Sequence, residues 1–232
     1  METYKNIATG VELPDHKLVF VAAPKVASSS IKKMFFYLFF DQPFEPINPD
    51  GSKYRIHRDF SGSRRFHAVP KGKYDDWTKI TLVRDPVERL LSAYGNKVVD
   101  FGMLSEKWLD PKEVENLGVK MNPPLYYFIR NLDKYRILSR SIWHHTDPFT
   151  SFLGHDLGYF DRVFSFKQLP ELVDFVSNHT GKTAVLPKST NSAKTKCSYS
   201  DLGIEAKKSI LTFCAGDYAL LKDYYTPPSL QD

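Results

Sequence analysis

Cysteine is scarce in this sequence, which has two in 232 residues, Cys197 and Cys214. A chain of this length can bury a sizeable core without covalent cross-links, so we expect no disulfide framework and a reducing compartment. Long hydrophobic runs are missing too: MFFYLFF at 34–40 is the longest and is too short to span a bilayer. The first 17 residues show no basic segment followed by an apolar one. We therefore expect a soluble, cytoplasmic protein without a transmembrane segment.

Signatures of nucleic-acid binding are also missing. The sequence has no concentrated basic run, no RNA-type aromatic motif and no zinc-finger spacing, so we expect no nucleic-acid partner. The net charge is nevertheless +5, from 32 Lys and Arg against 27 Asp and Glu. This mild excess favours an anionic ligand or substrate. The hydrophobic content of 42% is typical of a packed globule rather than a disordered chain.

Three short apolar segments are typical of buried strands: KLVFVAA at 17–23, TKITLVRDP at 78–86 and DRVFSF at 161–166. Each is followed by a segment whose apolar residues recur every three or four positions, as on one face of a helix. This alternation predicts the α/β class, with a parallel central sheet flanked by helices. We expect a single domain over residues 1–232.

Between these elements the pattern is less regular. Residues 41–76 are rich in Pro, Gly and charged side chains, which predicts long loops with at most a short helix. A further helix is expected after a cap at Asn122, with Leu125, Phe128, Ile129 and Leu132 on one face.

The first strand runs into PKVASSSIKK at 24–33. In parallel sheets, ligands bind beyond the carboxyl ends of strands, where helix N-termini present N–H groups and a positive dipole end. Lys25 and three serines at such a junction could surround a phosphate. On these residues alone, a turn and helix cap with a solvated Lys25 is an equal alternative. The G-x-x-x-x-G-K-[ST] signature is absent, which argues against a phosphoryl kinase.

The second strand ends in a comparable junction, LVRDPVERLLSAY at 82–94. Arg84 lies at the end of the strand, and Ser92 lies two turns into the expected helix. The alternative here is that Arg84 pairs with Asp85 or Glu88 and that Ser92 is a small packing residue. Two junctions of this kind in one α/β chain favour anion binding more than one would.

Both junctions resemble motifs of the sulfotransferase family, particularly its carbohydrate or heparan 2-O-type branch. PKVASSSIKK resembles the 5′-phosphosulfate loop, P-K-[VT]-[AG]-x-[ST]-x, and VRDPVERLLSAY resembles the 3′-phosphate motif, V-R-[DN]-P-x-x-R-[LF]-x-S-x-Y. The second motif is the more specific of the two. Together they cover about a tenth of the chain.

The resemblance implies a nucleotide-kinase-like (P-loop-like) α/β fold that binds 3′-phosphoadenosine-5′-phosphosulfate (PAPS) as cosubstrate and requires no metal. Arg84 and Ser92 are implied to hold the 3′-phosphate, and Lys25 also to neutralise the leaving phosphate. The late basic segment LPKSTNSAKTK resembles one that closes over the nucleotide, which makes Lys194 a candidate phosphate ligand alongside Lys188 and Lys196; a solvated loop is the alternative. The residues implied to hold the 5′-phosphosulfate are Lys25, Val26, Ala27, Ser28, Ser29 and Ser30.

Transfer to a hydroxyl group needs a general base near the acceptor. In glycan 2-O-sulfotransferases a histidine upstream of the 3′-phosphate strand has this role, so the resemblance favours His67. WHHTDPFTSFL at 143–153 resembles the family's H-x-x-P-Q segment, with His145 as a candidate acceptor-site residue and Phe149 where glutamine is common. The other candidate bases are His57, His144, His145, and His155 or a carboxylate.

The predicted function is therefore sulfuryl transfer from PAPS to a hydroxyl group of a carbohydrate, glycolipid or small metabolite. The alternative is a catalytically silent module that binds nucleotides or polyanions on the same fold, for which Phe149 is the main support.

Overall fold

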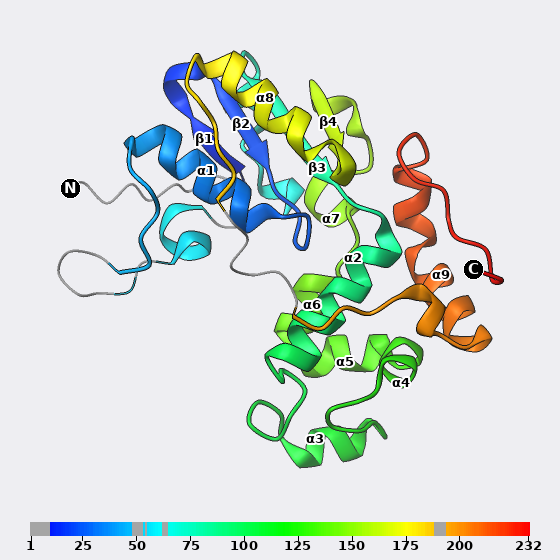
Figure 1. Cartoon of the computed structure of the whole chain (residues 1–232). Coiled ribbons are helices and arrows are strands. Elements are labelled where there is room, and N and C mark those ends of the chain that lie inside the picture. Colours follow the sequence, from blue (N-terminus) through cyan, green and yellow to red (C-terminus); the bar gives the residue numbers. More distant parts are fainter. Residues whose placement is uncertain (1–9, 48–52, 54, 62–64, 188–193) are drawn as a thin grey trace. The chain divides into compact units, whose positions relative to one another are not determined.

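The computed structural model describes residues 10–47, 53, 55–61, 65–187 and 194–232. The described chain forms two compact units (Figure 1). The first is built from the described residues of Met1–Val83 and Phe149–Asn191, and the second from those of Arg84–Pro148 and Ser192–Asp232. Each unit thus combines two separate stretches of sequence. The single domain over residues 1–232 stays a prediction.

A four-stranded sheet forms the centre of the described part of the first unit, in the order β1-β2-β3-β4. β2 pairs in parallel with β3, and β3 pairs in parallel with β4, whereas β1 is an antiparallel edge strand. The α/β class with a largely parallel central sheet is therefore confirmed. The strands are β1 (Gly10–Leu13), β2 (Leu18–Val21), β3 (Thr78–Val83) and β4 (Arg162–Ser165).

The three predicted strands are present, and their apolar composition explains their position. All four residues of β2 are buried, as are the last four of β3. Strands covered on both faces by other elements read as continuous apolar runs, as these do. β1 was not predicted; it is short, and its buried Glu12 interrupts the apolar pattern.

Three α-helices of the first unit accompany the sheet: α1 (Ser28–Phe40), α7 (Thr150–Leu153) and α8 (Leu169–Thr180). α1 lies beside β1 and α8 beside β4 (Figure 1). The rings of Phe20 in β2 and Phe35 in α1 are 6.1 Å apart, so the apolar face of α1 packs on the sheet. Within the described part of residues 41–76, expected as loops, there are three short helical turns, at Ile56–Phe60, Phe66–Ala68 and Lys71–Tyr74.

The described part of the second unit is helical. Its core joins Leu90 and Leu91 of α2 to Ile210 and Cys214 of α9. The predicted cap at Asn122 is wrong: Asn122 has φ 47°, and the helix begins later, because Pro124 is its N-cap. The helices are α2 (Pro86–Ala93), α3 (Pro111–Asn116), α4 (Leu125–Arg130), α5 (Leu132–Leu138), α6 (Arg140–Thr146) and α9 (Ile204–Leu220).

Candidate functional site

The loop between β2 and α1 has an unusual backbone. Lys25 has φ 68° and Ala27 has φ 61°, and neither is glycine. Left-handed conformations cost a non-glycine residue about 1–2 kcal/mol, and they persist where the surrounding structure imposes them. Alternation of left-handed and right-handed residues turns successive N–H groups toward one side, which forms a concave anion site, or nest. Val26, between them, is fully buried and anchors the turn.

The helix that follows this loop has no side-chain cap. Its N-cap is Ala27, whose carbonyl accepts from the N–H groups of Ser30 and Ile31 at 3.0 and 3.2 Å. The first N–H groups of any helix lack intrahelical partners, and here no N-cap side chain satisfies them. Ser28 is buried, whereas Ser29 and Ser30 are half-buried. Of the predicted residues, 25–27 form the loop and Ser28–Ser30 the first turn of α1, so backbone N–H groups and hydroxyl groups that suit an anion follow one another along the chain.

The junction after β3 is built differently. Asp85 is a conventional N-cap whose side chain accepts from the N–H of Glu88 at 3.0 Å, and Pro86 occupies the first helical position. The Arg84 Nε atom lies 3.4 Å from a Glu88 carboxylate oxygen. This contact agrees with the alternative given for this junction, in which Arg84 pairs with Asp85 or Glu88. An ion pair with an exposed carboxylate contributes about 0–1 kcal/mol, so it is weak enough to yield to a phosphate.

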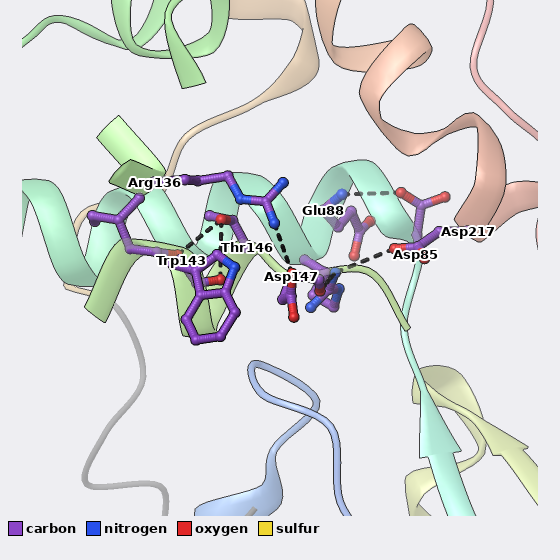
Figure 2. A network of polar contacts seen from close by, with 9 residues as sticks. Asp85, Glu88, Arg136, Trp143, Thr146, Asp147 and Asp217 are labelled. Carbon is purple, nitrogen blue, oxygen red and sulfur yellow. Dashed lines mark hydrogen bonds and ion pairs between the residues drawn. The ribbon is translucent and has the colours of Figure 1, made fainter. Parts of the chain in front are cut away.

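A buried polar network holds α2 in the second unit (Figure 2). The Arg89 side chain, 2% exposed, donates to the Asp147 carbonyl at 2.6 Å and to the Asp217 carboxylate at 3.2 Å. Arg136 donates to the Asp147 carboxylate at 2.7 Å. Arg89 belongs to the second motif, but the sequence analysis gave it no role. Its burial shows that it fixes α2 to α9 and to the end of α6.

The cap residue Asp85 joins the same region. It accepts a hydrogen bond from the Tyr218 hydroxyl of α9 at 2.9 Å. Burial raises the pKa of Asp85, while the bonds from Glu88 N–H and Tyr218 act in the opposite direction. Ser92 is half-buried in the last turn of α2. Ser92 therefore stands on a helix that is firmly held within its own unit, and Arg84 directly precedes the cap of that helix.

The histidine that contacts the β2–α1 loop is His57, not the favoured His67. The His57 Nε2 atom lies 2.8 Å from the Ser29 hydroxyl, and His57 belongs to the π-helical turn Ile56–Phe60. π-helical turns occur frequently at functional sites. His67 is exposed in the short turn Phe66–Ala68.

His57 also contacts Lys32, one turn after the loop in α1. Lys32 is fully buried; its Nζ atom lies 3.3 Å from His57 Nδ1 and donates to the Ser61 carbonyl at 2.9 Å. Burial lowers the pKa of Lys32 to about 7. Lys32 was not among the predicted site residues, although a lysine inside the apolar stretch IKKMFF is a signal for such a side chain.

The second unit contains His145, Lys194 and Lys196, whereas the exposed His155 and the buried Phe149 belong to the first. His145 is half-buried in α6, where its Nδ1 pairs with the Ser141 carbonyl at 2.8 Å. Lys194 is exposed; its backbone N–H donates to the Asp100 carboxylate at 2.8 Å, and Thr195 binds the same carboxylate. Lys196 is exposed, and Lys188 lies outside the described residues. Phe149, where related sequences have glutamine, is a fully buried side chain of the first unit.

No group of three or more His, Cys, Asp and Glu side chains in the described part of the chain could hold a metal ion. None of the described helices has the length and apolar character needed to cross a membrane.

Comparison with known proteins gives one match. The family model described as the sulfotransferase family matches residues 12–209, which is the greater part of the chain. This match includes both strand-to-helix junctions and the π-helical turn with His57. No curated protein and no solved structure matches the chain significantly.

Proposed function

This chain belongs to the sulfotransferase family, and we propose that it transfers a sulfuryl group from PAPS to a hydroxyl group of a carbohydrate, glycolipid or small metabolite. The observation that carries the proposal is the β2–α1 loop, where Lys25 and Ala27 are left-handed without being glycine. Backbone strain of this kind clusters at ligand sites, where it sets the geometry before the ligand binds. The loop supplies donors in the place where an anionic group needs them.

The two ends of the donor would be held by different junctions. In the proposal, Lys25 and the backbone of Val26–Ser30 bind the 5′-phosphosulfate, and Arg84 and Ser92 bind the 3′-phosphate. Arg84 would exchange its weak contact with Glu88 for a charge-assisted bond to the phosphate. Lys194, exposed and tied through its backbone to Asp100, is a further candidate for the nucleotide phosphates.

The chemistry is an in-line displacement at sulfur. The bond from sulfur to the donor's phosphate oxygen breaks while the bond to the acceptor oxygen forms, and the acceptor proton passes to a base. Lys25 neutralises the charge that develops on the leaving phosphate, and His67 is the proposed base. A sulfuryl group carries less charge than a phosphoryl group, so the proposal requires no metal. By analogy with phosphoryl transfer, positioning dominates the rate.

The acceptor would be bound by groups in addition to the base. His145 is the proposed contact, since its Nδ1 is engaged by Ser141 and its ring is thereby fixed. Phe149 cannot replace the glutamine of related sequences in a polar contact, because a phenyl ring has no hydrogen-bond donor or acceptor, and its side chain is fully buried. Its role is packing, so the substitution is weak support for a catalytically silent module.

Binding of adenosine 3′,5′-bisphosphate, the reaction product, tests the proposal by isothermal titration calorimetry. Arg84→Ala should weaken binding about 10- to 100-fold for this ligand and leave adenosine 5′-phosphate unaffected, because an interaction with a charged group is lost only where the 3′-phosphate exists. Arg130→Ala, an exposed arginine of α4, is the matched control. Equal losses for both ligands would contradict the role of Arg84.

Transfer from labelled PAPS to a panel of hydroxylated acceptors tests the chemistry. Lys25→Ala should abolish transfer, and His67→Ala should abolish it with nearly unchanged nucleotide affinity. Full activity of Lys25→Ala would refute the proposal. Tight bisphosphate binding without turnover on any acceptor would favour the silent binding module instead.

A further inference from the structure

Lys32 occupies an unusual place for a lysine. It lies in α1 one turn after the β2–α1 loop, is fully buried, and is flanked by the buried Ile31 and Phe35. Lysine is almost never fully buried unless polar groups hold its ammonium. Its Nζ atom meets such groups in the Ser61 carbonyl at 2.9 Å and His57 Nδ1 at 3.3 Å. A buried cation that the fold must accommodate at this cost is expected at a functional site.

His57 connects Lys32 to the anion loop. The imidazole contacts Lys32 through Nδ1 and the Ser29 hydroxyl through Nε2, at 3.3 and 2.8 Å. In its charged form Lys32 donates and cannot accept, so the Nδ1 that faces it is then the unprotonated nitrogen. The tautomer with hydrogen on Nε2 follows, and that hydrogen is donated to the Ser29 oxygen. The Ser29 O–H must then donate elsewhere.

The direction of this hydrogen-bond chain matters because the ligand is an anion. A hydroxyl rotates, and it presents either its hydrogen or its lone pairs to a neighbour. Phosphate and sulfate oxygens accept only, so a serine in an anion loop is useful when its hydrogen points at the ligand. Ser29 occupies the hydroxyl position of the loop motif, in the first turn of α1.

We propose that Lys32 and His57 are positioning residues that hold the Ser29 hydroxyl as a hydrogen-bond donor to the 5′-phosphosulfate of the sulfuryl donor. The inference rests on the proposed function and extends it to two residues with no assigned role in donor binding. The chain of donors runs from Lys32 through His57 to Ser29, and all three residues belong to the first unit. A nearby anion favours the charged form of a lysine, the form in which Lys32 acts as this donor.

Lys32→Met tests the buried end of this chain, because methionine keeps the length and removes the donor. Adenosine 3′,5′-bisphosphate, whose 5′-phosphate stands for the phosphosulfate, should bind the variant about 10-fold more weakly, the usual effect of one lost bond to a charged group. Adenosine 3′-phosphate, which lacks the 5′ group, should bind equally to both proteins. Lys33→Met, the same change one residue later, is the matched control. An unchanged ratio of the two affinities in folded Lys32→Met would overturn the inference.

His57 variants separate positioning from proton transfer. Glutamine can accept from Lys32 and donate to Ser29, so His57→Gln should retain bisphosphate affinity and transfer within about threefold. His57→Leu should lose as much affinity as Lys32→Met does, and His16→Leu is its control. If His57→Gln abolishes transfer with normal binding, His57 is a base and the inference is wrong.

A double-mutant cycle completes the test. Once Ser29→Ala has removed the hydroxyl, adding Lys32→Met should cost no further bisphosphate affinity, because both changes break the same chain. Additive losses would show that Lys32 acts independently of Ser29 and would contradict the inference. Absence of bisphosphate binding by the wild type is a different result: it refutes the proposed function itself.

Discussion

At the end of β2 the chain enters α1 through two left-handed residues, Lys25 and Ala27, whereas at the end of β3 it enters α2 through a capping Asp85 and Pro86. The first junction leaves helix N–H groups without a side-chain cap and buries the cation Lys32 nearby. The second satisfies its own helix end and anchors α2 by the Arg89 network. The first junction thus sacrifices stability to prepare donors for a ligand, and the second contributes stability while carrying Arg84.

The largest effect is expected at the second junction. Arg89→Met should lower the free energy of unfolding by about 3–5 kcal/mol, because it leaves the buried Asp217 carboxylate without its partner. Chemical denaturation measured by circular dichroism gives this number directly. Arg130→Met is the control in the same unit, and it should change stability by less than about 0.5 kcal/mol, since Arg130 is exposed. A similar small loss for Arg89→Met would remove the claimed difference between the junctions.

Removal of Lys32, near the first junction, should instead raise the free energy of unfolding. Burial lowers the pKa of Lys32 to about 7 in the folded protein, below its value of about 10.4 in an unfolded chain. Between these two pH values the unfolded state binds more protons, so wild-type stability rises as the pH rises through this window. Below about pH 7 the full penalty of burying the charge applies.

Lys32→Met should therefore stabilise the protein at pH 7, by about 2–4 kcal/mol once the lost hydrogen bonds are subtracted. Its stability should also lack the rise between about pH 7 and pH 10 that the wild type shows. Denaturation curves at several pH values measure both effects, with Lys33→Met as the control. Parallel pH profiles for Lys32→Met and the wild type would contradict a buried, titrating lysine.

The sequence predicted the parts of this comparison that depend on local pattern. β2, β3 and β4 follow from continuous apolar runs, and both junctions were located from residue types at strand ends. β1 was missed because its buried Glu12 is satisfied by Lys73, some sixty residues away, at 2.6 Å. No local pattern reports a partner at that separation.

The candidate site shows the same limit. Lys25 to Ser30 could be predicted because they are contiguous, but the contact of Ser29 with His57 could not, because it depends on how the distant turn Ile56–Phe60 packs against α1. The resemblance favoured His67 by its position upstream of β3, and its role as the base stays a prediction. The conventional cap at Asp85, in contrast, is a local feature and is readable from DP followed by an amphipathic segment.

The smallest expected effects come from two alanines, Ala27 at the first junction and Ala93 at the end of the helix that follows the second junction. Ala27→Gly should raise the free energy of unfolding by about 0.5–1 kcal/mol, since glycine adopts φ 61° without strain. Ala93→Gly, at the end of α2 with φ −69°, should lower the free energy of unfolding by about 1 kcal/mol. Glycine in a helical conformation costs more backbone entropy on folding, and it removes the packed methyl group of the alanine. Thermal unfolding of each variant, compared with the wild type, measures both changes in stability. Stabilisation of Ala27→Gly together with weaker bisphosphate binding would show that the left-handed alanine stiffens the loop for its ligand. Loss of stability in both variants would mean that the first junction is not strained, and the contrast between the two junctions would then rest on Lys32 alone.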